Sequence, residues 1–458
     1  MSNIKKATNL LDLLDIGSPD QVAIREPGGR EFTYDTLRSQ VDSIGKQLRS
    51  MGVKRTDRVA IVIPNSAETI ITFLGVAAAA TAAPLNPAYK PEDFKFLVED
   101  TNAVAIITTA GESSTVHDVA SDNTIHIELE VKPDNTVTLS NDKSNGSSSD
   151  SYEPDSEDVA LVLHTSGTTS RPKMVPLKHG NLAKSVDNII NTYDLVADDI
   201  ALCVMPLFHV HGLVASTLST FASGGTVSVP PKFNVLNFLR ITEQEKFTWY
   251  TAVPSIHQTL LARAKGRESA YKLSELKFIR SCSSSLAPAT MLGLEELFEV
   301  PVLEAYGMTE ASHQMSSNPL PPGTRLPGSV GHGTGVDIAI MNDTGNLLDT
   351  LTRGEVVIKG SNVFSGYENN SEANATSFTD GWFRTGDEGM LDQNGYLTLL
   401  GRIKEIINRS GEKISPREID EILLSHPAVA EAVAFGIPHP THGEEPSAAV
   451  VLLSLIHI

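Results

Sequence analysis

The stretch HTSGTTSRPKMVP, residues 164–176, gathers hydroxyl side chains around one glycine and then adds an arginine and a lysine. Hydroxyls and the backbone N–H groups of a glycine-containing loop form a concave set of donors that can hold phosphate oxygens. Basic side chains add charge-assisted hydrogen bonds. The stretch therefore predicts a loop that grips a polyphosphate, with a solvated Ser/Thr turn as the alternative. The loop residues are Thr165, Ser166, Gly167, Thr168, Thr169, Ser170, Arg171, Pro172 and Lys173.

The spacing of this loop excludes a P-loop of the Walker type. That motif needs a glycine, four further residues, and then Gly-Lys-Ser/Thr. Counted from Gly167, the position of the second glycine is held by Pro172. The stretch is therefore something other than a Walker-type P-loop.

The chain around the loop alternates strand and helix patterns. Residues 158–167 read as a strand that runs into the loop, and 58–64 and 103–109 read as further buried strands. A small-residue helix is expected near 66–80. An amphipathic helix is indicated by the helical spacing of Leu37, Val41, Ile44 and Leu48, with Gly52 near its end. This alternation predicts an α/β fold of layered subdomains with some parallel sheet.

The second half of the chain indicates shorter strands and a separate final region. Strands are expected at 354–360 and 393–401, and later at 429–437 and 448–453. A capping box, Ser415-Pro416-Arg417-Glu418, predicts the start of a helix.

We expect an N-terminal domain over 1–401 and a separate C-terminal domain over 402–458. The polar segment 131–157 is low in complexity and is predicted to be a long surface loop or linker.

Composition narrows the class of protein. The 458 residues are 40% hydrophobic, enough to bury substantial cores, and a formal net charge of -20 argues against a nucleic-acid partner. Two cysteines form no disulfide framework and suit a reducing compartment. Signal-peptide and membrane-span patterns are absent from the sequence, so a cytoplasmic protein is expected. No sequence feature fixes an oligomeric state.

The motifs together resemble a known superfamily. TSGTTSRPK (165–173) is similar to the phosphate loop of the AMP-forming adenylate enzymes, which include acyl-CoA synthetases, adenylation domains and firefly luciferase. The matching motifs follow in the family order: EAYGMTE (304–310), GEVVIKG (354–360), WFRTGD (382–387) and GRIKEIINRSGEKISP (401–416). The likeness spans nearly the whole chain. It implies a large N-terminal domain and a small α+β lid.

Within that superfamily the chain most resembles the oxalate–CoA ligases, the peroxisomal-CoA-synthetase-like group of plants and fungi. Three stretches carry this likeness: PLFHVHGL (206–213), FIRSCSSSLAP (278–288) and MTEASHQMSSNPLP (308–321). Ser170 also fits the group. Met174 stands where the group usually keeps a glycine, and its side chain could crowd the loop and change the affinity for ATP.

The resemblance implies a reaction in two halves, in which a carboxylate attacks the α-phosphate of ATP and the thiol of coenzyme A then displaces AMP. Thr309 would contact the α-phosphate, and Glu310 would bind Mg²⁺. Tyr306 would stack on adenine, with Gly307 and Met308 completing the nucleotide motif. Ordinary packing is the alternative for Tyr306, and a solvated surface charge is the alternative for Glu310.

Two more residues would hold the nucleotide. Asp387, in a tight turn, could accept from both ribose hydroxyls, and its alternative role is a turn cap. Arg402 could reach ribose or phosphate, and its alternative is a surface salt bridge.

The predicted acid pocket is polar. A second carboxylate in place of a fatty tail needs buried donors. The sequence supplies Ser283, Ser284 and Ser285, and the motifs place His209, His211 and His313 nearby. Contacts to a small diacid are expected from Ser283 and His313, with His209 closing the site. The alternative is that His209 only gates the site and His313 is a satisfied polar residue. The alternative enzyme is a ligase for coumarate or medium-chain acids.

The C-terminal region should serve coenzyme A. Lys404 matches the family's hinge and would act in catalysis through domain rotation. Gly411 would let backbone approach the pantetheine arm, and Arg409 and Lys413 could meet phosphates of coenzyme A.

The family's lid runs further and carries an adenylating lysine that is missing before the end at VVLLSLIHI. We therefore expect a truncated chain that binds ATP but adenylates poorly. A nucleotide-binding pseudoenzyme is the alternative class, and a peroxisomal address could belong to a missing end.

Overall fold

The computed structural model describes residues 7–111, 115–119, 121, 123–141, 152–165, 172–231, 233–424, 426 and 428–452. The chain forms two compact units. Unit 1 comprises Met1–Thr251, Met308–Gln314 and Ser361–Asn374, and unit 2 comprises Ala252–Gly307, Met315–Gly360 and Ala375–Ile458.

Unit 1 contains a seven-stranded sheet in the order β7-β6-β5-β3-β4-β8-β9. Its inner strands are parallel, and the edge strands β7 and β9 are antiparallel to their neighbours. The strands are β3 (Arg58–Val62), β4 (Thr81–Pro84), β5 (Ala105–Thr109), β6 (Ile125–Val131), β7 (Val137–Asn141), β8 (Val159–Thr165) and β9 (Lys173–Lys178). The predicted phosphate loop therefore lies between β8 and the edge strand β9, which is antiparallel to β8.

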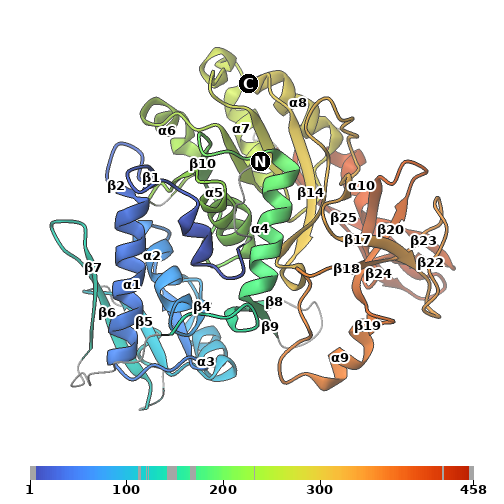
Figure 1. Ribbon diagram of the computed structural model, residues 1–458. Coiled ribbons are helices and arrows are strands. Elements are labelled where there is room, and N and C mark those ends of the chain that lie inside the picture. The colour runs from blue at the N-terminus through green and yellow to red at the C-terminus, as the bar shows by residue number, and fades with distance from the viewer. Residues whose placement is uncertain are drawn as a thin grey trace. The chain divides into compact units, whose positions relative to one another are not determined.

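Helices cover this sheet (Figure 1). They are α1 (Tyr34–Ser50), α2 (Ala67–Ala77) and α3 (Pro91–Thr101). The apolar positions predicted for α1 are all buried, and the side chains of Thr33 and Ser66 cap α1 and α2. Gly75 lets the two helices approach, because a Cβ there would lie 2.4 Å from Ile44 Cγ2.

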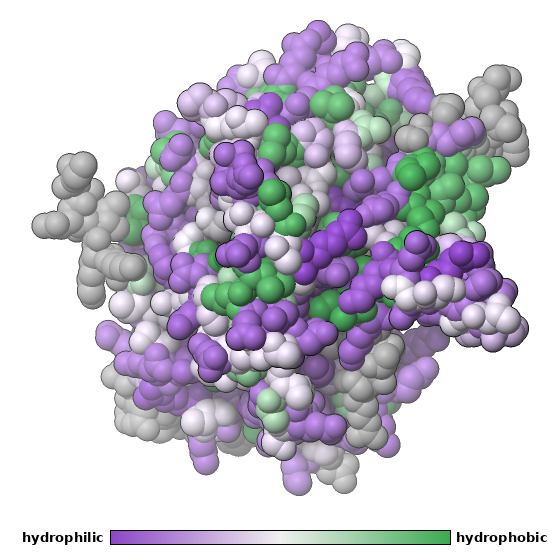
Figure 2. Space-filling model, turned by 90° about the vertical axis from the view of Figure 1, so that its right-hand side faces the viewer, coloured by the Kyte–Doolittle hydropathy of each residue, from purple (hydrophilic) through white to green (hydrophobic). Residues whose placement is uncertain are grey.

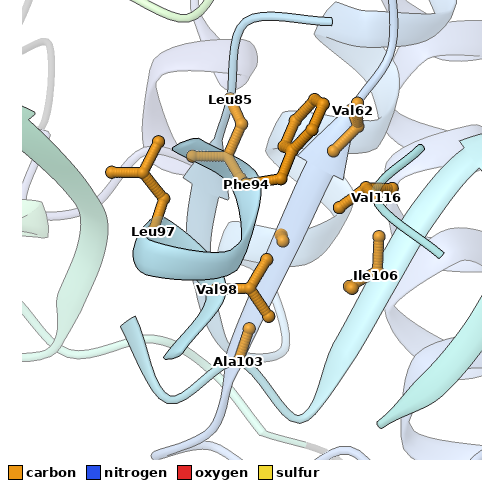
Figure 3. Close-up of a cluster of buried hydrophobic side chains, with 9 residues drawn as sticks. Val62, Leu85, Phe94, Leu97, Val98, Ala103, Ile106 and Val116 are labelled. Atoms are coloured by element: carbon orange, nitrogen blue, oxygen red, sulfur yellow. The ribbon is translucent and has the colours of Figure 1, made fainter. Parts of the chain in front are cut away.

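The helix α3 closes one core of unit 1 (Figure 3). Its residues Phe94, Leu97 and Val98 face Val62 from β3 and Ile106 from β5. Burial of such side chains contributes roughly 1.5–3 kcal/mol each. This core fixes β3 and β5, which belong to the same sheet as β8 and β9 on either side of the predicted phosphate loop.

The rest of unit 1 contains the strand order β12-β10-β11-β1-β2. These are β1 (Val22–Arg25), β2 (Glu31–Thr33), β10 (Ile200–Cys203), β11 (Thr226–Ser228) and β12 (Trp249–Ala252). The helical segments are η1 (Asp12–Asp15), α4 (His179–Tyr193), the π-helix η2 (His211–Leu218), α5 (Ser219–Ala222), η3 (Val235–Asn237), α6 (Phe238–Gln244) and the 3-10 turn η5 (Thr309–Ala311).

Unit 2 begins with the parallel pair β13 (Phe278–Ser281) and β14 (Val302–Met308). The neighbouring elements are α7 (Pro254–Ala264), η4 (Glu268–Tyr271), α8 (Pro288–Phe298), β15 (His313–Ser317) and β16 (His332–Gly333). A five-stranded sheet follows, built from β17 (Asp337–Met341), β18 (Gly354–Lys359), β19 (Phe378–Thr379), β20 (Trp382–Leu391) and β21 (Leu397–Arg402). The short helix α9 (Ser371–Ser377) precedes β19.

The end of unit 2 is a four-stranded sheet in the order β23-β22-β25-β24, with α10 (Pro416–Leu424) packed against β24 and β21. The strands are β22 (Ile407–Arg409), β23 (Glu412–Ile414), β24 (Val429–His439) and β25 (Gly443–Leu452). Figure 2 looks onto the side where Figure 1 draws this sheet, and it shows hydrophobic surface there. Exposed apolar side chains include Val433, Phe435, Ile437, Val451 and Leu452.

The structure corrects one prediction. The segment 131–157 is not a loop throughout, because Val137–Asn141 forms the edge strand β7, paired with β6. Two side chains of α1 hold this strand: Gln40 Oε1 accepts from the N–H of Val137 at 2.9 Å, and Gln47 Oε1 accepts from that of Leu139 at 2.8 Å. Hydrogen bonds from α1 thus stabilise a strand in a segment whose polar composition had predicted a loop.

In the described part of the chain, none of the helices has the length and apolar character that crossing a membrane requires.

Candidate active site

The ends of the predicted phosphate loop lie opposite each other. Thr165 closes β8, Lys173 opens β9, and the two residues are paired in register. The side chain of Met174 is 2% exposed and packs with Ala83 and Val162 in the core. The predictions for six loop residues lie outside the described residues: Ser166, Gly167, Thr168, Thr169, Ser170 and Arg171. Pro172 follows them directly before β9.

Lys173 and Glu310 are linked through Tyr367 within unit 1. The Lys173 ammonium lies 4.5 Å from the centre of the Tyr367 ring, a cation–π distance. The Tyr367 hydroxyl donates to Glu310 Oε1 at 2.7 Å. Glu310 is 5% exposed, so its carboxylate is a buried charge rather than a solvated one. The buried Glu310 carboxylate and the Lys173 ammonium are therefore separated by one side chain, that of Tyr367.

A strap over residues 361–368 holds this arrangement. The N–H of Phe364 donates to the carbonyl of Glu310 at 2.8 Å. The N–H of Glu368 donates to the carbonyl of Met174 at 3.1 Å. Asn362 Nδ2 donates to the carbonyl of Ala311 at 2.8 Å. The strap thus fixes both β9 and the turn η5, whose first residue is Thr309 and whose preceding residue is Met308.

Two histidine rings are stacked inside unit 1. The rings of His211 and His313 have centroids 5.1 Å apart and planes 23° apart, and both side chains are buried. His211 Nε2 and Thr251 Oγ1 form a hydrogen bond of 2.6 Å. His313 adopts φ +103°, a conformation that non-glycine residues rarely take and that the surrounding structure must hold. His209 is exposed, next to the ring of Phe208 at 4.7 Å.

Unit 2 brings together Tyr306, Asp387 and Arg402. The Tyr306 hydroxyl donates to Asp387 Oδ2, and Arg402 Nε donates to Asp387 Oδ1 at 3.0 Å. Burial, and then the Asp387 charge, raise the pKa of Tyr306 well above its usual value. An ionised carboxylate has about four acceptor sites, so further donors can still bind Asp387. Gly307 follows Tyr306 on β14.

Asp387 lies within β20, in a bulge rather than a simple turn. The register of β18 against β20 shifts at this point, and Gly386 adopts φ +74°. The N–H of Asp387 donates to Thr385 Oγ1 at 3.1 Å. A β-bulge redirects side chains and is common beside functional sites.

The three serines lie in the loop between β13 and α8. Ser283, Ser284 and Ser285 are exposed, and Ser283 adopts φ +73°. The loop is tied at its end, because the N–H of Leu286 donates to Glu304 Oε1 at 3.0 Å. The three serines are therefore exposed on a loop whose base is fixed.

The predicted coenzyme A residues lie around the hairpin of β22 and β23. Lys404 is exposed in the turn after β21, and Lys413 is exposed on β23. Gly411 adopts φ +91° in the tight turn, where a side chain would be strained. Arg409 Nε pairs with Glu445 at 2.9 Å, so this guanidinium is partly neutralised.

Sequence reasoning missed several of these contacts. Tyr367 and Thr251 stand outside every quoted motif, and no spacing points to them. Glu304 lies inside the motif EAYGMTE, but no role was predicted for it. An acidic residue between the apolar residues of the strand VLEAY was the available signal.

Comparison with known proteins defines the class. Residues 17–368 match the AMP-binding enzyme family, and residues 418–455 match the AMP-binding enzyme C-terminal domain. The chain belongs to the AMP-binding enzyme family. Its curated relatives include the oxalate–CoA ligase of Arabidopsis thaliana, 46% identical, with 94% of this chain and 86% of that protein covered. The oxalate–CoA ligase of Saccharomyces cerevisiae is also 46% identical, with 87% of this chain and 78% of that protein covered.

Solved structures agree with the fold. ATP-bound MatB from Rhodopseudomonas palustris superimposes with a TM-score of 0.88 at 28% identity, covering 98% of this chain and 90% of that one. MenE from Bacillus subtilis, in complex with ATP and magnesium ion, gives 0.84 at 26% identity, covering 97% and 89%. The predicted fold class is confirmed: a mixed α/β fold with a larger N-terminal domain and a smaller C-terminal one.

Proposed function

We propose that this protein is an ATP-dependent acid–CoA ligase that converts oxalate to oxalyl-CoA through an oxalyl-AMP intermediate. The similarity to oxalate–CoA ligases of a plant and a yeast, over most of the chain, supports this most strongly. The buried histidine pair and the exposed serines add support, since a small diacid needs donors rather than an apolar tunnel.

The nucleotide side of the proposal uses the residues that the motifs predict. Lys173 would bind the terminal phosphates beside the loop, and Thr309 would donate to the α-phosphate. Asp387 would accept from the ribose hydroxyls, with Arg402 beside it, and Tyr306 would pack against adenine. Such donors stabilise charge that develops on the phosphate during attack by the acid.

Magnesium fits Glu310. Mg²⁺ binds proteins through one or two carboxylates and keeps several waters. Glu310 offers a buried carboxylate with one oxygen hydrogen-bonded to Tyr367, so the group is oriented before a metal binds. When bound, the ion would neutralise phosphate charge. Tyr367 would keep the carboxylate in position.

The acid would be held by Ser283 and His313, with Ser284 and Ser285 beside it and His209 closing the site. The C-terminal residues would serve the second half-reaction, with Lys404 as hinge and Gly411 and Arg409 beside coenzyme A. The domain boundary near residue 401 belongs to the same proposal, and the two separate family matches support it. A cytoplasmic location is also proposed, supported by two free, buried cysteines.

The test is a direct assay with ATP, Mg²⁺, coenzyme A and oxalate, in which oxalyl-CoA and AMP are measured. Coumarate and octanoate serve as competing acids. We expect kcat/KM for oxalate to exceed that for either competitor by at least about tenfold, because unpaired buried donors disfavour an apolar acid. Preference for coumarate or octanoate would refute oxalate as substrate, and ATP binding without turnover would favour the pseudoenzyme.

A further inference from the structure

Glu304 is a buried carboxylate to which the reaction outlined above gives no role. It lies on β14, and its side chain is 1% exposed. Oε1 accepts the N–H of Leu286 at 3.0 Å. Among the described residues Oε2 has no hydrogen-bond partner. A buried charge in this state is costly unless something compensates it.

The compensating charge comes from the C-terminal helix. Arg417 on α10 places Nη2 3.6 Å from Glu304 Oε1, and its side chain is 11% exposed. Arg417 is itself held in place: Nη1 donates to the carbonyl of Leu399 at 3.1 Å, and Nε pairs with Glu421 at 2.7 Å. One carboxylate oxygen thus faces both the end of the serine loop and the helix α10.

A second carboxylate in unit 2 also accepts a backbone N–H and pairs with an arginine, but both of these partners lie outside the serine loop. Glu295 Oε1 accepts the N–H of Val302 at 3.0 Å and pairs with Arg325 at 2.9 Å. This second set gives a matched control, because it joins a carboxylate, a backbone N–H and an arginine at a site with no predicted function.

We propose that Glu304 is a positioning residue that holds the loop carrying Ser283, Ser284 and Ser285, and that Arg417 makes this hold depend on α10. The serines' contact with the acid rests on the proposed function, whereas the hold on the loop does not. The consequence is that the acid pocket responds to the C-terminal region through one ion pair.

The electrostatics supply a signature. Burial raises the pKa of Glu304 to about 7, while Arg417 and the N–H of Leu286 lower it and Glu421 raises it. Arg417 and Glu421, both on α10, are the charged groups acting on Glu304 within the described part of the chain. An ionised acceptor holds an N–H more strongly than a neutral one. The loop should therefore be held more firmly as pH rises through about 7.

The first test measures hydrogen exchange of the Leu286 amide in the full chain at pH 8. In Glu304→Leu, which removes the acceptor, we expect exchange to accelerate roughly tenfold or more, because the amide loses a hydrogen bond to a charged acceptor. Glu304→Gln keeps an acceptor and should lie between, and Glu295→Gln should leave Leu286 unchanged. Unchanged protection in both Glu304 variants would overturn the proposal.

The second test is the pH profile of kcat/KM for whichever acid the wild-type protein ligates. We expect kcat/KM to rise through about pH 7 in the wild type and to stay flat in Glu304→Gln. In Arg417→Met the rise should move to higher pH. Arg417→Lys keeps the positive charge and should bring the rise part of the way back towards the wild-type pH. KM for ATP is the internal control. A wild-type rise that persists in Glu304→Gln contradicts the proposal. A wild-type protein without ligase activity would instead refute the proposed function, and the exchange comparison would still decide the role of Glu304.

Discussion

The hydroxyl of Tyr306 donates a hydrogen bond to the carboxylate of Asp387, although the two residues are 81 positions apart in the sequence. Both side chains are buried, and Asp387 Oδ1 is paired with Arg402. Two motifs that the sequence shows separately, EAYGMTE and WFRTGD, therefore meet in one hydrogen-bonded group. The proposed adenine and ribose contacts depend on that group.

Tyr306→Phe should weaken both ATP binding and the fold. The ring remains to pack against adenine, but Asp387 loses one donor and becomes freer to rotate. We expect a loss of about 1 kcal/mol in unfolding free energy and a several-fold higher KM for ATP. Chemical denaturation and initial-rate kinetics measure the two effects. Tyr396→Phe, which removes a hydroxyl bonded to the carbonyl of Thr324 at 2.7 Å, is the control for losing any tyrosine hydroxyl. A KM that rises equally in both variants would count against a role for Asp387 in binding ribose.

Tyr367→Phe should raise the Mg²⁺ concentration needed for half-maximal activity. The ring keeps its cation–π contact with Lys173, whereas Glu310 loses the hydrogen bond that orients it. We expect a shift of roughly three- to tenfold in the Mg²⁺ titration, corresponding to about 1 kcal/mol. Titration of Mg²⁺ at saturating ATP measures it. An unchanged midpoint, together with a lower Tm, would mean that Tyr367 only stabilises the fold.

His211→Phe tests whether the stacked pair orients His313. Phenylalanine keeps a flat ring against His313 but removes the hydrogen bond to Thr251. We expect KM for oxalate to rise by about tenfold while KM for ATP stays within about twofold, because a misplaced donor costs acid binding alone. Thr251→Val should reproduce the effect, and Thr251→Ser, which keeps the hydroxyl, should not. Equal losses for oxalate and ATP would show that the pair has no specific part in binding the acid.

The sequence predicted the helices and strands around the candidate site better than the side-chain contacts within the site. Local patterns located α1, α2, β3, β5 and β8, because burial imposes a period on each element. The strand β7 was missed, since its two apolar positions lie in a polar segment and the glutamines that hold it come from α1.

Motifs located Glu310 and His211 but not their hydrogen-bond partners. Tyr367 and Thr251 become neighbours of the site only through chain segments far apart in the sequence, which local spacing cannot reveal. Glu304 and Arg417 are joined in the same way.

His179→Gln should reduce the loss of unfolding free energy that acidification causes. Burial lowers the pKa of His179 to about 4, and Nδ1 accepts the N–H of Leu10 at 3.2 Å, which a protonated ring could not do. Because the unfolded chain takes up this proton near pH 6.5 and the folded chain only near pH 4, stability is full above pH 6.5 and is lost as pH falls towards 4. A shift of this size corresponds to about 3 kcal/mol, most of which should be recovered in the variant. Urea denaturation at pH 7 and pH 4.5 measures the difference, with exposed His426→Gln as control. If His179→Gln loses as much stability on acidification as the wild type, the N-terminal contact at Leu10 is not what acid breaks.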